Sequence, residues 1–225
     1  DVAARLPSIT DGGNATAITI DASENVGIGI TPAAINKFQV KQATNINLGI
    51  RGAESTTGSI VVQAIDDAAN NNIPLELRAT AVTMPLQPAF QVGATSMQSN
   101  IATGTSVTVV FGGETFDVGS NFASNTFTAP VTGKYSLTAN LRVDNIDSAA
   151  AYYSLILSTS NRTYRTLVDP DYGQDNLYSH MSLTCLADMD AGDTSHIVLV
   201  QSGGTAQADI DGDSQYTRFS GYLVC

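Results

Sequence analysis

Apolar and polar residues alternate along most of this chain with a period of two, the spacing of a β-strand that has one buried face. The 3.6-residue period of an amphipathic helix is nearly absent. Turn-forming residues separate the alternating runs. The pattern therefore predicts an all-β protein, and in the first third of the chain it places short strands at residues 18–20, 26–30, 46–50 and 75–77.

The frequency of large side chains changes near residue 86. Phe38 is the only aromatic residue before this point, whereas aromatic residues recur after it. Short strand patterns with turns between them follow there, which is typical of a β-sandwich. The proline-containing stretch 84–90 separates the two parts, so we expect domains at 1–86 and 87–225. The strands expected in the second domain are 105–111, 124–129, 134–143, 151–159, 162–168, 177–187, 195–201 and 216–224.

The N-terminal domain has too few bulky apolar side chains to be stable as a separate globule. Its stretch ENVGIGITP places Gly27 and Gly29 inside a strand pattern, whereas a phosphate-binding loop would need a helix after the glycines. A strand face without side chains allows another backbone to approach closely. We therefore expect copies of residues 1–86 to wrap around one another, with their Ile and Val faces at a common axis, as an interwoven trimeric β shaft.

Composition and charge exclude several partners. The formal net charge is −11, and only 14% of the residues are charged. An acidic surface repels the phosphates of nucleic acids and of anionic membranes. No run approaches the roughly 18 apolar residues that a membrane-spanning helix needs, so we expect no membrane insertion. A cation, or a partner with a basic or sugar surface, stays open. Because the chain begins at Asp1, we expect it to be a piece of a longer polypeptide.

The sequence motifs of common active sites are missing. His180 and His196 are isolated, with no Cys or His at metal-ligand spacing, and no G-x-S-x-G element occurs. Two cysteines, Cys185 and Cys225, are too few for a disulfide framework; we expect free thiols, with a bridge as the alternative. We therefore expect no enzyme, although a carboxylate pair for glycoside cleavage depends on three-dimensional separation and stays open.

The segment LVDPDYGQDN is a turn-rich loop with candidate receptor-binding residues. Tyr172, and Tyr178 shortly after the loop, can stack on a sugar face, and the carboxylates of Asp169, Asp171 and Asp175 can accept hydrogen bonds from its hydroxyls. Loops at the end of a rigid sandwich often carry binding residues. The alternative is a solvated loop with one tyrosine packed inward.

The segment QADIDGDSQ contains the most suggestive acidic cluster. Asp209, Asp211 and Asp213 are spaced by two, so their carboxylates share one strand face or surround a turn at Gly212. Ca²⁺ binds several carboxylate and carbonyl oxygens, and three chains would bring nine carboxylates together. These residues are therefore the candidate metal ligands, with Ca²⁺ as the candidate ion and a solvated acidic loop as the alternative.

Three separated motifs in the second domain resemble the C1q/TNF-like family. FTAPVTGKY at 127–135 resembles the family's F-T-x-P-x-x-G-x-Y signature, Ala-Gly-Asp at 191–193 its turn, and FSGYL at 219–223 its closing strand. The resemblance covers residues 88–225. It implies a trimeric jelly-roll β-sandwich that binds ligands and is not an enzyme, and some such relatives hold calcium near the trimer apex.

The segment ENVGIGITPAAINKFQV at 24–40 is similar to a repeat of bacteriophage tail fibres and some bacterial surface proteins. Together the two resemblances imply a homotrimeric receptor-binding tail-fibre protein of the virion, which contacts other fibre or virion proteins and a host-surface glycan or protein receptor. The matching residues are Asn25, Val26, Gly27, Ile28, Gly29, Thr31, Pro32, Lys37 and Val40.

Two other classes of function stay open from the sequence. In the first, the protein is secreted or displayed on a cell surface, and its head only caps the trimer and sets its register. In the second, the protein is a spike that cleaves polysaccharides.

Overall fold

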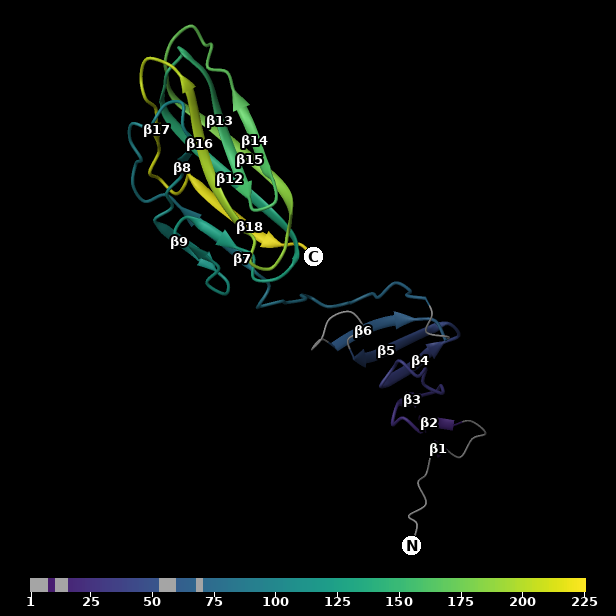
Figure 1. Cartoon of the computed structure of the whole chain (residues 1–225). Coiled ribbons are helices and arrows are strands. Elements are labelled where there is room, and N and C mark those ends of the chain that lie inside the picture. The colour runs from purple at the N-terminus through teal and green to yellow at the C-terminus, as the bar shows by residue number, and fades with distance from the viewer. Residues whose placement is uncertain (1–7, 11–15, 53–59, 68–70) are drawn as a thin grey trace. The chain divides into compact units, whose positions relative to one another are not determined.

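The computed structural model describes residues 8–10, 16–52, 60–67 and 71–225. By internal contacts the chain divides into two compact units, residues 1–82 and 83–225. All regular elements in the described residues are strands (Figure 1). The prediction of an all-β protein is therefore confirmed.

The first unit contains one six-stranded sheet in which the strands follow their order along the chain. Neighbouring strands are antiparallel, except that β3 and β4 are parallel. The strands are β1 (Ser8–Thr10), β2 (Thr16–Ile20), β3 (Val26–Ile28), β4 (Phe38–Ala43), β5 (Ile46–Gly52) and β6 (Ile60–Ile65). The strand predicted at 75–77 is wrong. That segment forms no ladder, and Leu75 and Leu77 are 50% and 64% exposed.

The turn after β3 explains the glycines of ENVGIGITP. A Cβ on Gly27 would lie 2.2 Å from the carbonyl oxygen of Ile30 and 2.8 Å from Cδ of Pro32, so a backbone does approach this position closely. That backbone belongs to the same chain. Gly29 has φ of +68°, which favours glycine and ends the strand. The prediction of a strand over 26–30 is thus wrong in its second half, because β3 ends at Ile28.

One face of this sheet is covered by a layer of side-chain amides. Gln39 Oε1 accepts hydrogen bonds from Asn36 Nδ2 and Ala33 N, both at 3.0 Å, and Gln63 Nε2 donates to Asn36 Oδ1 at 2.9 Å. Asn36, Gln39 and Gln63 are buried. Their hydrogen bonds offset part of the cost of removing the amides from water, although Gln39 Nε2 is buried without a partner among the described residues, and they hold the 29–37 crossover onto the sheet.

The second unit is a sandwich of two sheets, which confirms the predicted sandwich (Figure 1). One sheet has the order β10-β11-β16-β13-β14 with β8 paired to β16, and the other has the order β15-β12-β18-β7-β9 with β17 paired to β12. The connections β11–β12, β12–β13, β14–β15 and β15–β16 pass between the sheets, as in jelly rolls. The strands are β7 (Ala89–Gly93), β8 (Val107–Thr108), β9 (Gly113–Asp117), β10 (Phe122–Ala123), β11 (Thr126–Thr128), β12 (Gly133–Ile146), β13 (Ala150–Thr159), β14 (Thr163–Val168), β15 (Asn176–Met189), β16 (Thr194–Gly203), β17 (Asp209–Ile210) and β18 (Arg218–Leu223).

The core of the sandwich follows the alternation of the sequence. Tyr135, Leu137, Ala139 and Leu141 lie on the inner face of β12 and are fully buried. They pack with a cluster of phenylalanine rings, in which the centroid of Phe90 lies 4.5 to 5.5 Å from its neighbours. The strand predicted at 105–111 is mostly absent. Beyond β8, two backbone N–H groups donate to the side chains of Gln98 and Asn125, so the ladder ends there.

Candidate functional site

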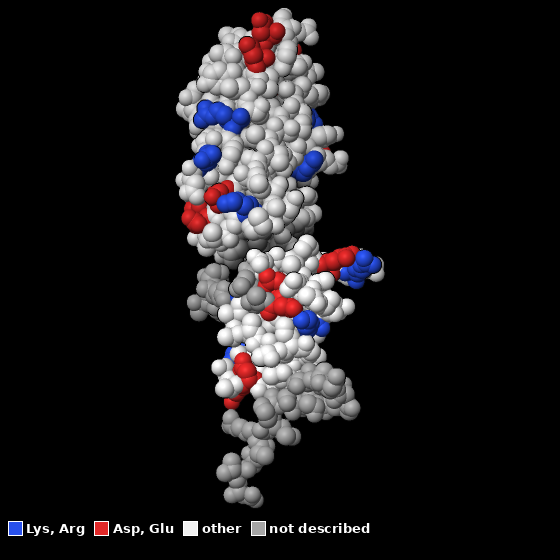
Figure 2. Space-filling view, turned by 90° about the vertical axis from the view of Figure 1, so that its right-hand side faces the viewer, with Lys and Arg blue, Asp and Glu red and all other residues white. Residues whose placement is uncertain are grey.

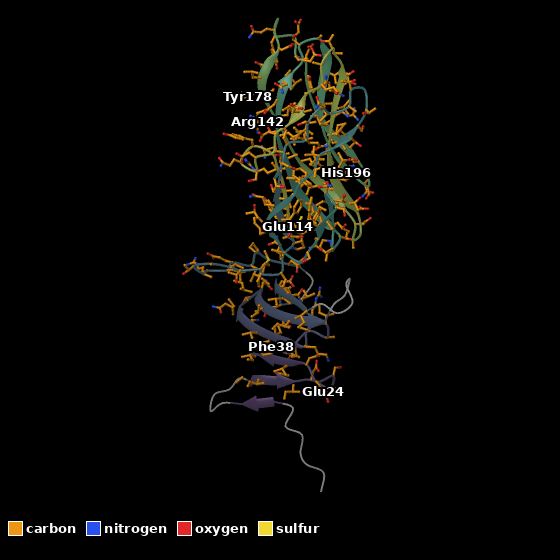
Figure 3. The ribbon with its side chains drawn as sticks, turned by 90° about the vertical axis from the view of Figure 1, so that its left-hand side faces the viewer. Glu24, Phe38, Glu114, Arg142, Tyr178 and His196 are labelled. Atoms are coloured by element: carbon orange, nitrogen blue, oxygen red, sulfur yellow. The ribbon has the colours of Figure 1, made fainter. Side chains whose placement is uncertain are left out.

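The sheet of the first unit carries an exposed apolar face opposite its amide layer. Exposed members of this face include Ile28, Leu48 and Val62, at 38%, 39% and 54%, and Phe38 is labelled in Figure 3. Two cross-strand rows form the face, Ile18–Ile28–Val40–Leu48–Ala64 and Ile20–Val26–Phe38–Ile50–Val62. An apolar face of this extent in a single chain is typical of an interaction surface.

The outer face of the β15-β12-β18-β7-β9 sheet is uncharged at its centre and has a hollow of ≈ 320 Å³. Phe116 and Tyr222 line this hollow, and both rings are about half exposed. Ser136, Thr138 and Ser220 also line it. Figure 2 shows, on the side in view, small groups of charged side chains over a surface that is otherwise uncharged. This face combines aromatic and hydroxyl groups that can pack against another protein or a sugar.

The five residues predicted to bind a receptor make different contacts in the structure. Asp169 accepts a hydrogen bond from Asp171 N at 3.2 Å, which forms a local turn. Asp175 Oδ1 accepts hydrogen bonds from the backbone and hydroxyl of Ser148 at 2.9 and 2.8 Å, so it joins two loops. Tyr172 is about half exposed and makes no ring contact within the described part of the chain. Tyr178 lies on β15, and its ring packs against Arg142.

The ring of Tyr178 belongs to a cluster around Arg142, on the outer face of β12 (Figure 3). The guanidinium carbon of Arg142 lies 4.3 Å from the ring centroid of Tyr178 and 5.1 Å from that of Tyr216. Its Nε and Nη2 donate to the two carboxylate oxygens of Asp144 at 2.7 and 2.8 Å, and its Nη1 lies 3.3 Å from Asp211 Oδ1. We call Arg142, Tyr178 and Tyr216 the Tyr–Arg platform.

The electrostatics of the platform keep Arg142 charged and fixed. The paired hydrogen bonds that Arg142 donates to Asp144 raise the pKa of Arg142 above its usual value, and the carboxylates of Asp144 and Asp211 are both buried. Sequence reasoning missed Arg142 and Tyr216. A signal existed for the first, since Arg142 and Asp144 are two residues apart and share one strand face. No signal existed for Tyr216, which reaches the site from the loop before β18.

The three candidate metal ligands have hydrogen-bonding partners within their own chain. The carboxylate of Asp209 accepts from Asn100 N at 2.6 Å and from Asn145 Nδ2 at 2.8 Å. Asp211 Oδ2 accepts a hydrogen bond from Asp213 N at 2.8 Å, and Asp211 Oδ1 pairs with Arg142 Nη1. Within the described residues no three acidic, His or Cys side chains are grouped to hold a metal. The Ca²⁺ site therefore stays a prediction, whether it forms within one chain or is shared between chains.

Asp147 holds the neighbouring loops in place. It is 2% exposed, and its carboxylate accepts from Ala149 N at 2.8 Å, from Ala206 N at 2.6 Å and from Thr205 N. These hydrogen bonds lower the pKa of Asp147, and the one donated by Ala206 N makes the largest contribution. The loops 144–151 and 203–208 are thereby tied to each other at this end of the sandwich.

Both cysteines are free thiols. Burial raises the pKa of Cys185 to about 11, so its thiolate is scarce near neutral pH. Cys225 is exposed. The described residues contain no helix that is long and apolar enough to cross a membrane.

No protein-family model and no curated protein matches the chain. Among solved structures, the globular domain of the zebrafish complement 1qA protein is 16% identical, with a TM-score of 0.45, and the match covers 62% of this chain and 98% of that one. Murine APRIL at pH 8.0 is 11% identical, with a TM-score of 0.47, and covers 61% of this chain and 99% of its own. With TM-scores below 0.5, these likenesses assign the chain to neither protein's family.

Proposed function

We propose that this chain is the receptor-binding tip of a bacteriophage tail fibre. In this proposal it is a homotrimer of the virion, with an interwoven β shaft at its N-terminus and a C1q-like head that attaches to a host-surface receptor. The observation that carries the proposal is the exposed apolar face of the N-terminal sheet. The resemblances of residues 24–40 to fibre repeats and of 88–225 to C1q/TNF-like domains support it.

The apolar face supports assembly on energetic grounds. The 29–37 crossover covers the amide face of the sheet. Among the described residues, several side chains of the apolar rows on the other face remain exposed. Burying the exposed part of such side chains contributes roughly 0.5–1.5 kcal/mol each. Copies of the same sheet supply a matching apolar surface, and three copies can enclose it around one axis.

Attachment in this proposal requires only non-covalent binding of the receptor, with no catalysed reaction. Three identical heads raise the total affinity although each contact is weak. The loops 144–151, 169–178 and 203–213 are the proposed contact region. Asp147 and Asp175 support this role, because they fix these loops before a ligand arrives and so reduce the entropy lost on binding.

The first test is the molar mass in solution, measured by light scattering. We expect three times the 23.4 kDa of one chain. A monomer at micromolar concentration would refute the shaft.

The second test is adsorption of the fluorescently labelled chain to a panel of bacterial strains. We expect saturable binding to a subset of strains. A stable trimer that adsorbs to no strain would favour a head that only caps the assembly. Release of reducing ends from strain polysaccharides would instead indicate a cleaving spike.

A further inference from the structure

We propose that the Tyr–Arg platform is a binding site for an uncharged sugar ring. This inference rests on the proposed function and narrows it, because the receptor then contains a neutral hexose or N-acetylhexosamine. It concerns a cluster assembled from β12, β15 and the loop before β18.

The two rings of the platform are fixed and accessible. Each ring turns one face toward the guanidinium of Arg142, yet Tyr178 remains 62% exposed and Tyr216 44% exposed. Both residues therefore leave surface available to a ligand. Figure 3 shows Arg142 and Tyr178 next to each other on one side of the second unit.

The platform is preorganised. Arg142 is held by hydrogen bonds to both oxygens of Asp144 and by the charge of Asp211. These ion pairs fix the guanidinium, and the rings pack on it in turn. An aromatic side chain that is already ordered loses little entropy when a ligand stacks on it.

The charges around the platform restrict the ligand. Arg142 faces the carboxylates of Asp144 and Asp211, and Arg218 and Asp213 add one nearby charge of each sign, so these five groups sum to −1. This disfavours uronic acids, other anionic sugars and nucleic acids. A cationic ligand is disfavoured differently, because the rings already face the positive charge of Arg142. A neutral sugar avoids both penalties, and its C–H groups suit the electron-rich ring face.

Polar groups around the platform can pair with sugar hydroxyls. His180 lies opposite Arg142 in the β12–β15 register and is exposed. Asp213 and Ser214 are exposed in the turn that leads to Tyr216. A few polar groups beside an aromatic surface are typical of small-ligand sites.

The experiment uses all 225 residues of the chain on biosensor surfaces that display one probe each. The probes are the trisaccharides of N-acetylglucosamine, mannose and galacturonate, and the peptide tri-lysine. We call the first two trisaccharides the neutral trimers. We compare wild type with Tyr178→Ala, Tyr216→Ala and Tyr178→Phe. Tyr152→Ala is the matched control, because it removes an exposed tyrosine of the other sheet, on β13, that contacts no other ring in the described structure.

We expect wild type to bind a neutral trimer and to bind neither galacturonate nor tri-lysine. Each alanine substitution in the platform should weaken binding about 3- to 10-fold per site, as expected for a lost stacking contact. Tyr178→Phe and Tyr152→Ala should stay within about 2-fold of wild type, since one keeps the ring and the other leaves the platform intact. All variants should keep the wild-type molar mass.

Three results would overturn the inference. In the first, wild type binds neither neutral trimer. In the second, the platform variants bind like wild type. In the third, a platform variant loses assembly, which would place the rings between copies. Adsorption to bacterial strains separates this inference from the proposed function. If wild type adsorbs while the neutral trimers do not bind, the sugar site fails and attachment stands; if wild type adsorbs to no strain, attachment itself fails.

Discussion

Replacing Asp147 with alanine should strongly destabilise the second unit. The substitution removes the acceptor for three backbone N–H groups, those of Ala149, Thr205 and Ala206, and leaves a space beside a buried part of the loops. A buried donor without a partner costs about 1–3 kcal/mol, and hydrogen bonds to a charged acceptor are stronger than average. Since water can reach part of the loop, we expect the loss to total roughly 3–5 kcal/mol.

The pH dependence of this effect has a definite sign. Folding lowers the pKa of Asp147, so the carboxylate stabilises the folded state fully above the unfolded pKa of about 3.9. That contribution is lost as the pH falls through the lower folded-state pKa. The difference in unfolding free energy between wild type and Asp147→Ala should therefore be constant near neutral pH and shrink at strongly acidic pH.

The assay is denaturant unfolding at pH 7 and at pH 3, with equal protein concentrations because assembly shifts the midpoint. Asp169→Ala is the control, since Asp169 is exposed and accepts one hydrogen bond at 3.2 Å. We expect it to change the unfolding free energy by less than about 1 kcal/mol. A loss below about 1 kcal/mol for Asp147→Ala at pH 7 would refute the reasoning.

Three further predictions concern assembly, packing and thiol reactivity. Leu48→Asp places a charge on the apolar face and should convert the assembly to monomers by light scattering, whereas Gln42→Asp, at an exposed position, should not; an unchanged mass for Leu48→Asp contradicts the shaft. Gly221→Ala places a Cβ 2.5 Å and 2.8 Å from two core side chains and should lower the unfolding free energy by about 1–3 kcal/mol in the same denaturant assay; unchanged stability would mean that the core adjusts freely. At pH 8 a thiol reagent should modify Cys225 rapidly and Cys185 slowly, because burial raises the pKa of Cys185 to about 11, and mass spectrometry of the native protein measures both rates; equal rates would contradict the burial.

The alternation of side chains predicted much of the fold. It placed the inner face of β12 and the sandwich, because burial on one face of a strand requires apolar residues at every second position. The close contact at Gly221 was also predictable, since a glycine inside a strand often marks close packing. Alternation failed at 75–77, and it failed beyond Ile28 and Thr108. The period says which face a residue takes, but a strand also needs a neighbouring backbone to pair with.

The order of amino acids was enough to predict a protein built from strands, a sandwich in its second part and an acidic surface. Which side chains meet emerges only once the chain has folded. Gln39 and Gln63 are polar residues that form a buried layer, and Arg142 and Tyr216 lie 74 positions apart, yet they stack at one site. The physical reason is that such contacts depend on strand register and loop paths, which are set by packing across the whole unit and leave no local pattern in the chain.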